Sequence, residues 1–269
     1  MRGKLAVTAV TAAAAFSLGV FCSQVARGQA APHPAKGVAT QSAATPNLAG
    51  IWRRSRKPPD KSRKYTIFEL AMSISGEEPP MTPWGLAKFK AAKPNVGPNS
   101  VSLAQSNDPV INCFPPGVPR IYTQRGEPVE IIQISGRVLM FFEYDHFVRQ
   151  IYTDGRPHQK DAAATWMGES IGKWEGDTLV VDTVGFNDKT WLDAVGHPHS
   201  DQLHLVERIR RVNHDTLTID LTIDDPKAYT KPWGGHEVFE LKPTWNIGEM
   251  ICEDNVTFSD IQKKTEGGK

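Results

Sequence analysis

The stretch HLVERIRRVNHDTLTIDLTIDD, residues 204–225, alternates apolar and polar side chains on both sides of a short turn. Such alternation is typical of β-strands with one buried face. A two-residue turn at Asn213-His214 would place the apolar residues of the two strands on opposite faces of the sheet. A bulge or a three-residue loop would place them on the same face, because a one-residue shift in register exchanges the faces. Burial favours the second arrangement, so we expect a bulged hairpin.

Similar hairpins follow one another along the chain. A Ser-Gly turn at 135–136 joins two runs rich in β-branched and aromatic residues, and further runs end at Asp-Gly 154–155 and Glu-Gly 175–176. Short strands separated by turn residues at regular spacing are typical of antiparallel sandwiches and barrels. We therefore predict a mainly β protein, a single antiparallel barrel or sandwich of calycin or lipocalin type. A proline-rich N-terminal region should wrap it, and TPWGLAKFKAAKP, residues 82–94, should form one short helix.

The two ends of the chain are expected to lie outside this domain. Residues 1–30 have a basic start, an apolar stretch and small residues before a cleavage position, which is typical of a secretory signal peptide. Residues 31–47 are rich in Ala, Pro, Ser and Thr and predict a flexible tether. The β domain then spans 48–260, and a disordered tail spans 261–269. The expected location is periplasmic or secreted, with no membrane attachment after cleavage.

Charge and cysteine content narrow the partners and the compartment. The formal net charge is +1, which gives no indication of a nucleic acid or an anionic membrane as partner. After signal cleavage the chain keeps Cys113 and Cys252, and in an oxidising compartment such a pair predicts a disulfide. The alternative is a pair of buried free thiols.

A longer pattern surrounds the hairpin. The segments GESIGKWEGDTLVVDTVGFND (168–188), HLVERIRRVNHDTLTIDLTIDDPKAYTKPW (204–233) and ICEDN (251–255) together resemble a large family of secreted bacterial proteins that share a WEGDTLVV core. The resemblance covers residues 48–256 and implies an exported, mostly β protein. It implies no activity, so no catalytic residue follows from it.

Glu207 stands out in the hairpin, because it shares a face with Leu205 and Ile209. A carboxylate among aliphatic side chains is either a functional group or the partner of a nearby arginine, and the sequence leaves both open. The opposite face carries polar residues at every second position. These would point to solvent in an ordinary sheet, or into the lumen of a barrel that encloses a polar ligand.

A run of histidines precedes the hairpin. GHPHSDQLH, residues 196–204, contains His197, His199 and His204 together with Asp201. Three imidazoles and a water can complete a tetrahedral zinc site, and Asp201 could be a ligand or an acceptor for an imidazole N–H. The spacing matches no strong zinc signature. The alternatives are an acid–base or ligand-binding role and a structural turn.

A second cluster, FEYDHFVRQIYTDGR (142–156), brings Tyr144, His146 and Arg149 into a short span. A histidine or tyrosine base and an arginine that holds a carboxylate are what proton abstraction next to a carbonyl requires. Aromatic and acidic residues beside the loops are candidates for ligand contact. They are Tyr152, Trp166, Trp191, Asp224, Tyr229 and Trp233.

These clusters predict an exported enzyme that acts on a small polar organic molecule by acid–base chemistry, of lyase or isomerase type. The catalytic residues, expected around one cavity, are His146, Tyr144, Arg149, His199, His204 and Glu207. This chemistry needs no cofactor, and the expected partner is the small-molecule substrate. No Gly-rich phosphate loop, nucleophile elbow or Cys-x-x-Cys motif occurs in the sequence, which argues against phosphoryl transfer and serine hydrolysis.

Two other functions stay open. The first is a non-catalytic periplasmic barrel that binds a small ligand in a cavity lined by Leu, Ile and Trp, with the histidines outside. The second is a metal-dependent hydrolase, in which His197, His199 and His204 converge on one zinc ion.

Overall fold

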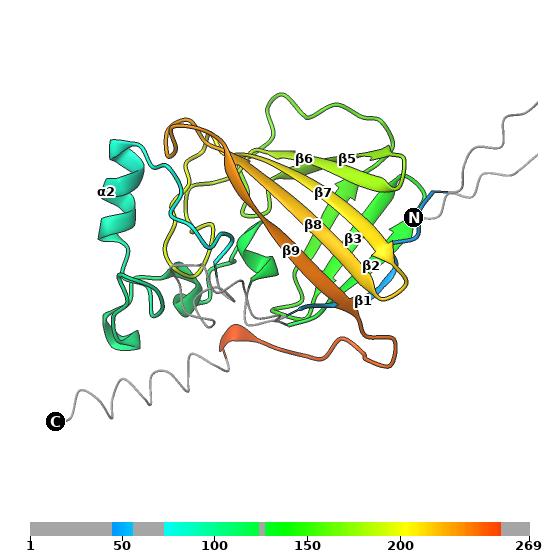
Figure 1. Cartoon of the computed structure of the whole chain (residues 1–269), viewed down its shortest axis with the longest axis horizontal. Helices are drawn as coiled ribbons and strands as arrows, with labels where there is room; N and C mark the ends of the chain where they lie inside the picture. The colour runs from blue at the N-terminus through cyan, green and yellow to red at the C-terminus, as the bar shows by residue number, and fades with distance from the viewer. Residues whose placement is uncertain (1–44, 56–72, 124–126, 254–269) are drawn as a thin grey trace, which may run out of the picture. The chain divides into compact units, whose positions relative to one another are not determined.

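The computed structural model describes residues 45–55, 73–123 and 127–253. Within these ranges nine strands form a closed barrel (Figure 1). They are β1 (Gly50–Arg54), β2 (Val129–Ile134), β3 (Arg137–Phe142), β4 (Val148–Tyr152), β5 (Glu169–Glu175), β6 (Thr178–Val184), β7 (His204–Asn213), β8 (Thr216–Asp224) and β9 (Trp233–Leu241). The predicted mainly β barrel is confirmed.

Pairing in the barrel largely follows the order of the chain. Consecutive strands pair antiparallel, and β1 pairs with β9 to close the barrel. The exception is the pair β4 and β5, which is parallel through Ile151–Ser170 and Tyr152–Ile171. Parallel neighbours need a long crossover connection, and residues 153–168 supply one. The barrel is therefore mixed rather than purely antiparallel.

The β7–β8 hairpin contains the predicted bulge. The register shifts beside the turn, so that Glu207 lies opposite Leu221 and both are buried. On the other face Arg208 lies opposite Asp220, and both are exposed. The polar face of this hairpin therefore points to solvent and its apolar face points into the barrel.

Aliphatic and aromatic side chains fill the barrel interior. Fully buried examples come from strands on all sides, namely Trp52, Ile151, Leu179, Leu205 and Ile223. Burying one such side chain stabilises the fold by about 1.5–3 kcal/mol. Because the interior is the hydrophobic core, functional groups have to be sought at its polar exceptions and at the ends of the barrel.

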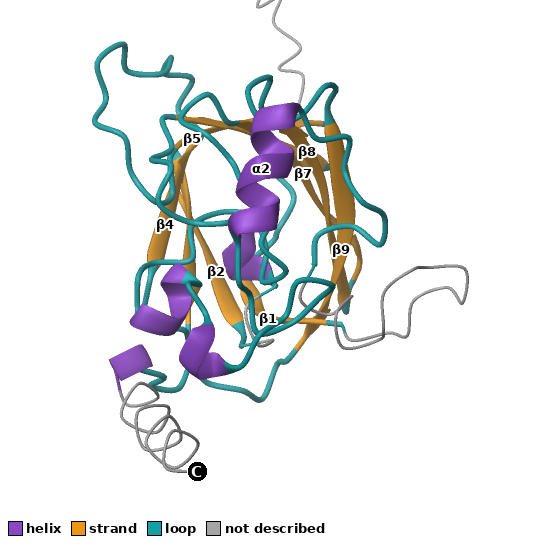
Figure 2. Cartoon of the chain, turned by 90° about the vertical axis from the view of Figure 1, so that its left-hand side faces the viewer, coloured by secondary structure: helices purple, strands orange, loops and turns teal. Residues whose placement is uncertain are grey.

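One α-helix, α2 (Pro83–Ala91), lies in the described part of the chain, where the sequence predicted a helix. Thr82 caps it by accepting a hydrogen bond from the Gly85 backbone N–H. A Cβ atom at Gly85 would lie 2.1 Å from the Ala228 carbonyl oxygen, so only glycine allows this approach to the loop after β8. Figure 2 shows α2 in front of the barrel strands. Three 3₁₀ helices follow, at Leu103–Gln105, Pro109–Asn112 and Arg120–Tyr122.

A disulfide joins Cys113 to Cys252, with the Cα atoms 5.5 Å apart. The predicted bond is confirmed, and the alternative of two free thiols is wrong. Cross-linking positions 139 residues apart stabilises the fold by about 4–5 kcal/mol in the chain-entropy model.

The predicted signal peptide and C-terminal tail lie outside the described residues, as does the tether up to residue 44. In the part that the structure describes, no helix has the length and apolar character needed to span a bilayer.

Candidate functional site

One polar cluster lies inside the barrel. Arg149 of β4 and Glu207 of β7 form a two-bond ion pair, in which Nη1 donates to Oε1 at 2.9 Å and Nη2 donates to Oε2. The Tyr122 hydroxyl accepts from Arg149 Nη1 at 2.5 Å and donates to Glu207 Oε1 at 2.7 Å. All three side chains are buried. With Ser170 and Thr183, they make up what we call the interior network.

The interior network occupies every nitrogen of the Arg149 guanidinium. Nε and Nη2 donate to Ser170 Oγ at 3.1 and 2.9 Å, and Nη2 also donates to Thr183 Oγ1 at 3.0 Å. Burial lowers the pKa of Arg149, but the Glu207 carboxylate outweighs it, so the pKa lies above its ordinary value. Burial raises the pKa of Tyr122 well above its ordinary value. Glu207 is thus the partner of an arginine, and an arginine so bonded does not fit the predicted role of holding a substrate.

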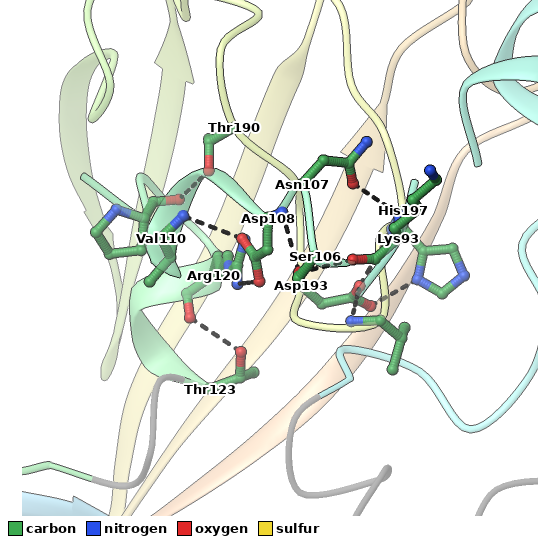
Figure 3. Close-up of polar contacts among 12 residues, drawn as sticks. Lys93, Ser106, Asn107, Asp108, Val110, Arg120, Thr123, Thr190, Asp193 and His197 are labelled. Atoms are coloured by element: carbon green, nitrogen blue, oxygen red, sulfur yellow. Dashed lines mark hydrogen bonds and ion pairs between the residues drawn. The ribbon is translucent and has the colours of Figure 1, made fainter. Parts of the chain in front are cut away.

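A second polar cluster lies in the loop between β6 and β7, residues 185–203, which we call the histidine loop. Its Asp193 and His197 are fully buried. His197 Nδ1 donates to Asp193 Oδ2 at 2.6 Å (Figure 3). Asp193 Oδ1 also accepts from the backbone N–H groups of Val195 and His197, at 3.2 and 3.3 Å. One carboxylate therefore holds both the imidazole and the backbone of the loop.

This contact sets the charge of His197. Burial opposes protonation of the imidazole, but the Asp193 carboxylate outweighs it and raises the pKa of His197 to about 9. Burial likewise opposes the charge of Asp193, but His197 keeps the pKa of this carboxyl below its ordinary value. The imidazole stacks on Phe89 of α2 with ring centroids 4.9 Å apart. Glu78 Oε2 lies 3.6 Å from His197 Nε2, which is beyond hydrogen-bonding distance.

His199 is also buried, but it has the opposite charge state. Its Nδ1 lies 3.1 Å from the backbone carbonyl oxygen of Ser200. A carbonyl only accepts hydrogen bonds, so Nδ1 carries the proton. Burial lowers the pKa of His199, so the ring is neutral at neutral pH. Its Nε2 then has a lone pair, for which the described residues supply no hydrogen-bond donor.

His199 lines a pocket of about 250 Å³ between the histidine loop and α2. Trp84 and Trp191 supply aromatic walls, and the exposed Lys88 and Lys189 lie at its edge. The remaining lining residues are Ala91, Ala92, Asn107, Asp188, Thr190 and Pro198. This pocket, with a neutral imidazole at its surface, is the candidate functional site.

The Trp191 wall is held from behind by a buried ion pair. The Arg120 guanidinium carbon lies 5.6 Å from the centroid of the Trp191 ring. Arg120 donates two hydrogen bonds to Asp108, at 2.8 and 2.6 Å (Figure 3). The aromatic wall is therefore positioned by a cation whose own charge is compensated.

The predicted Tyr144–His146 cluster has a structural role. The hairpin turn places Asp145 and His146 at positive φ. Asp145 Oδ1 accepts from the Cys252 backbone N–H at 2.6 Å, and His146 Nε2 donates to the Gly248 carbonyl at 3.0 Å. Tyr144 packs on Cys252 in the same small cluster. These residues hold the segment that carries the disulfide and do not line the candidate site.

His204 lies on the outer face of β7. Its Nε2 contacts Asp182 Oδ2 at 3.0 Å, and the other oxygen of Asp182 contacts His158 at 3.0 Å. His158 Nδ1 also lies 3.1 Å from Glu169 Oε2. His204 thus belongs to a surface cluster that ties the crossover connection to the barrel.

The predicted ligand-binding residues are divided between two regions. Near the histidine loop, Trp191 lines the pocket, the Tyr229 hydroxyl donates to the Pro198 carbonyl at 2.7 Å, and Trp233 packs on His197. Elsewhere, Trp166 stacks on Phe114, and Asp224 lies opposite His204 in the register of β7 and β8. Tyr152 and Arg149 both line a pocket of about 370 Å³.

The predicted catalytic set is therefore not gathered around one cavity. His199 lines the candidate site, Arg149 and Glu207 lie in the barrel core, and His204 faces outward. His204 and Glu207 are on the same strand but point to opposite faces, because they are an odd number of positions apart, whereas His199 lies in the loop before that strand. The three histidines of the zinc alternative also bond to different partners. Among the described residues no group of three or more His, Cys, Asp and Glu side chains is arranged to hold a metal ion.

The pocket residues Trp84, Lys88 and Lys189 were not predicted, nor were Asp193 and Ser200, which hold the two histidines of the loop. Trp84 and Lys88 come from α2, far from the histidine loop in sequence, and no local pattern marks them. Asp193 precedes His197 by four positions, a spacing that was available as a signal for a carboxylate–imidazole pair.

No protein-family model, curated protein or solved structure matches this chain. The resemblance through the WEGDTLVV core therefore stays a prediction.

Proposed function

We propose that the protein is an exported enzyme that acts on a small organic anion by acid–base chemistry, of lyase or isomerase type. In this proposal His199 is the general base that removes a proton from the substrate. The disulfide between Cys113 and Cys252 supports export, because such bonds persist in oxidising compartments. The same argument supports a periplasmic or secreted location.

The observation that carries the proposal is the state of His199. A general base must be unprotonated at working pH and must present its lone pair to the substrate. His199 is kept neutral by burial, and the Ser200 carbonyl fixes the proton on Nδ1. Nε2 is therefore the basic atom, and His199 lines the pocket while its ring packs edge-on against the core residue Phe186.

The surroundings of His199 indicate the kind of substrate. Lys88 and Lys189 place two ammonium groups at the edge of the pocket against the one carboxylate of Asp188, and this excess of positive charge favours an anion such as a carboxylate. Trp84 and Trp191 offer flat apolar walls for the carbon skeleton. Removing a proton from carbon is easier next to a carbonyl group, so a carboxylic acid with such a carbon fits both the walls and the base.

The test is exchange of carbon-bound hydrogen with solvent. Purified protein in D₂O is incubated with a panel of small 2-oxo and 2-hydroxy carboxylates, and loss of the proton signal is followed by ¹H NMR. His199→Asn keeps a donor for the Ser200 carbonyl but has no basic nitrogen. We expect it to slow exchange by about 10²–10⁴-fold.

His214→Asn is the matched control, because His214 is largely exposed in the β7–β8 turn. It should exchange substrate at the wild-type rate. Exchange that continues unchanged in His199→Asn would show that His199 is not the base.

A second candidate function is ligand binding without turnover, which the two tryptophan walls favour. In that case an acid of the panel would shift the His199 imidazole resonances saturably but would not exchange its protons. The ligand would occupy the pocket at the histidine loop, because packed side chains fill the barrel interior.

A further inference from the structure

Two buried N–H groups beside the histidine loop have no acceptor. Within the described part of the chain, His197 Nε2 and Trp233 Nε1 are buried and make no hydrogen bond. The two rings are in edge contact, with centroids 5.7 Å apart and planes at 61°. A buried donor without an acceptor costs about 1–3 kcal/mol. The two unsatisfied donors lie on rings that are in contact, so one acceptor group bound between the rings could serve both.

We propose that His197 and Trp233 form a binding site for the carboxylate group of a small organic acid. The two N–H groups would donate to the carboxylate oxygens. This site goes beyond the proposed function, since it requires no basic nitrogen on His199 and no chemical step.

The protonated His197 ring supplies a charged donor at this site. Asp193 accepts from His197 Nδ1 at 2.6 Å and so holds the ring in its protonated form, in which Nε2 is also a donor. Hydrogen bonds from an ionised donor to an ionised acceptor are about twice as strong as neutral ones. The apolar faces of Phe89 and Tyr229 contact the two rings. Exclusion of water by these faces strengthens the attraction further.

Glu78 indicates which anion fits. Its Oε2 lies 3.6 Å from His197 Nε2, so a carboxylate of the chain itself already approaches the site without making the hydrogen bond. The Glu78 side chain is 31% exposed and pairs with His197, so an incoming carboxylate would have to compete with it. A phosphate would bring more oxygens than two donors can satisfy. A monocarboxylate matches both the charge and the number of donors.

The test is an NMR titration of the ¹⁵N-labelled full chain with sodium acetate, at constant ionic strength and with sodium chloride as the reference. Trp233→Phe identifies the Trp233 indole resonance. We expect the Trp233 Nε1–H and His197 Nε2–H resonances to move downfield saturably with acetate and not with chloride. Trp233→Phe should weaken acetate binding about tenfold, which corresponds to about 1.4 kcal/mol.

Two further variants decide the outcome. Glu78→Gln removes the competing charge and should strengthen acetate binding about fivefold or more, whereas Trp245→Phe, at a half-exposed tryptophan elsewhere, should leave it unchanged. His199→Asn should also leave acetate binding at this site unchanged, so failure of the proposed function does not affect it. The proposal would be overturned if the Trp233 Nε1–H and His197 Nε2–H resonances did not shift with acetate. It would also be overturned if these two N–H groups were found to bond to a water molecule instead.

Discussion

The interior network and the histidine loop are both buried and polar, but they differ in how completely their atoms are bonded. In the interior network Arg149 bonds to Glu207, Tyr122, Ser170 and Thr183 through all three of its nitrogens. In the described part of the histidine loop, His197 Nε2 and His199 Nε2 have no hydrogen-bond partner.

The difference separates a structural cluster from a candidate site. A buried ion pair whose remaining groups are also satisfied holds strands together and has nothing left to offer a ligand. A buried imidazole with one nitrogen fixed and the other unused costs stability unless something binds there. The same residue types therefore predict stability effects in the first region and effects on binding or catalysis in the second.

The largest expected effect is on the interior network. Glu207→Leu removes the carboxylate and leaves the Arg149 cation buried without a counter-charge. Such changes destabilise by about 3–5 kcal/mol, and urea unfolding followed by circular dichroism would measure the loss. The double variant Arg149→Met/Glu207→Leu should recover most of it, because neither charge is then buried. Glu175→Gln, at an exposed ion pair, is the control. If Glu207→Leu lost no more stability than this control, the interior network would not be the structural cluster described above.

The second-largest expected effect is a dependence of the unfolding free energy on pH, caused by His197 in the histidine loop. The pKa of His197 is raised from 6.5 to about 9 on folding, so the folded state binds the proton more tightly than the unfolded state. The stabilisation is therefore complete below pH 6.5 and is lost as the pH rises to about 9, by about 3 kcal/mol at most. Unfolding free energies measured across this range would show the decline.

Asp193→Asn is the variant that tests this origin. It removes the charge that outweighs burial, so the alkaline decline should shrink and the pKa of His197 should fall, as a ¹H–¹⁵N NMR titration would report. Asp188→Asn changes an exposed carboxylate near His199 and should keep the decline. If Asp193→Asn lost as much unfolding free energy as the wild type between these pH values, another group would have to cause the decline.

The sequence predicted the barrel because the alternation in 204–225 is a local property that burial enforces throughout a strand. The bulge could be predicted for the same reason, since without it one strand would expose its apolar face. The parallel pair of β4 and β5 could not, because it depends on where the crossover of residues 153–168 returns to the barrel.

The site was less predictable, because its bonds join distant parts of the chain. Arg149 and Glu207 were both singled out, but their pairing across 58 positions was not visible. Conversely, His197 and His199 lie two positions apart and still differ in charge, because both are buried but only His197 has a carboxylate, that of Asp193, to outweigh the effect of burial on its pKa. Sequence patterns identify residues that can carry charge, whereas the fold decides which of them are already bonded.

A smaller loss of stability is expected when the Tyr122 hydroxyl is removed from the interior network. Tyr122→Phe removes a hydroxyl that accepts from Arg149 and donates to Glu207. Loss of these bonds should cost about 1–2 kcal/mol in urea unfolding. Tyr152→Phe is the matched control, since the Tyr152 ring packs against Arg156 near the surface, and it should have little effect. Equal losses in both would mean that the Tyr122 hydroxyl is not integral to the network.

The smallest expected effect on stability is that of His199→Asn, the variant with the largest expected effect on exchange. Asparagine can still donate to the Ser200 carbonyl, so the unfolding free energy at neutral pH should change by only about 0.5 kcal/mol. The pKa of His199 is lowered on folding, so the unfolded state binds its proton first as the pH falls below 6.5, and stability is lost there. The variant should lose this acid dependence while keeping the alkaline decline due to His197. A large loss of stability at neutral pH would instead show that His199 is a structural residue like Glu207. The histidine loop would then not differ from the interior network in the way proposed.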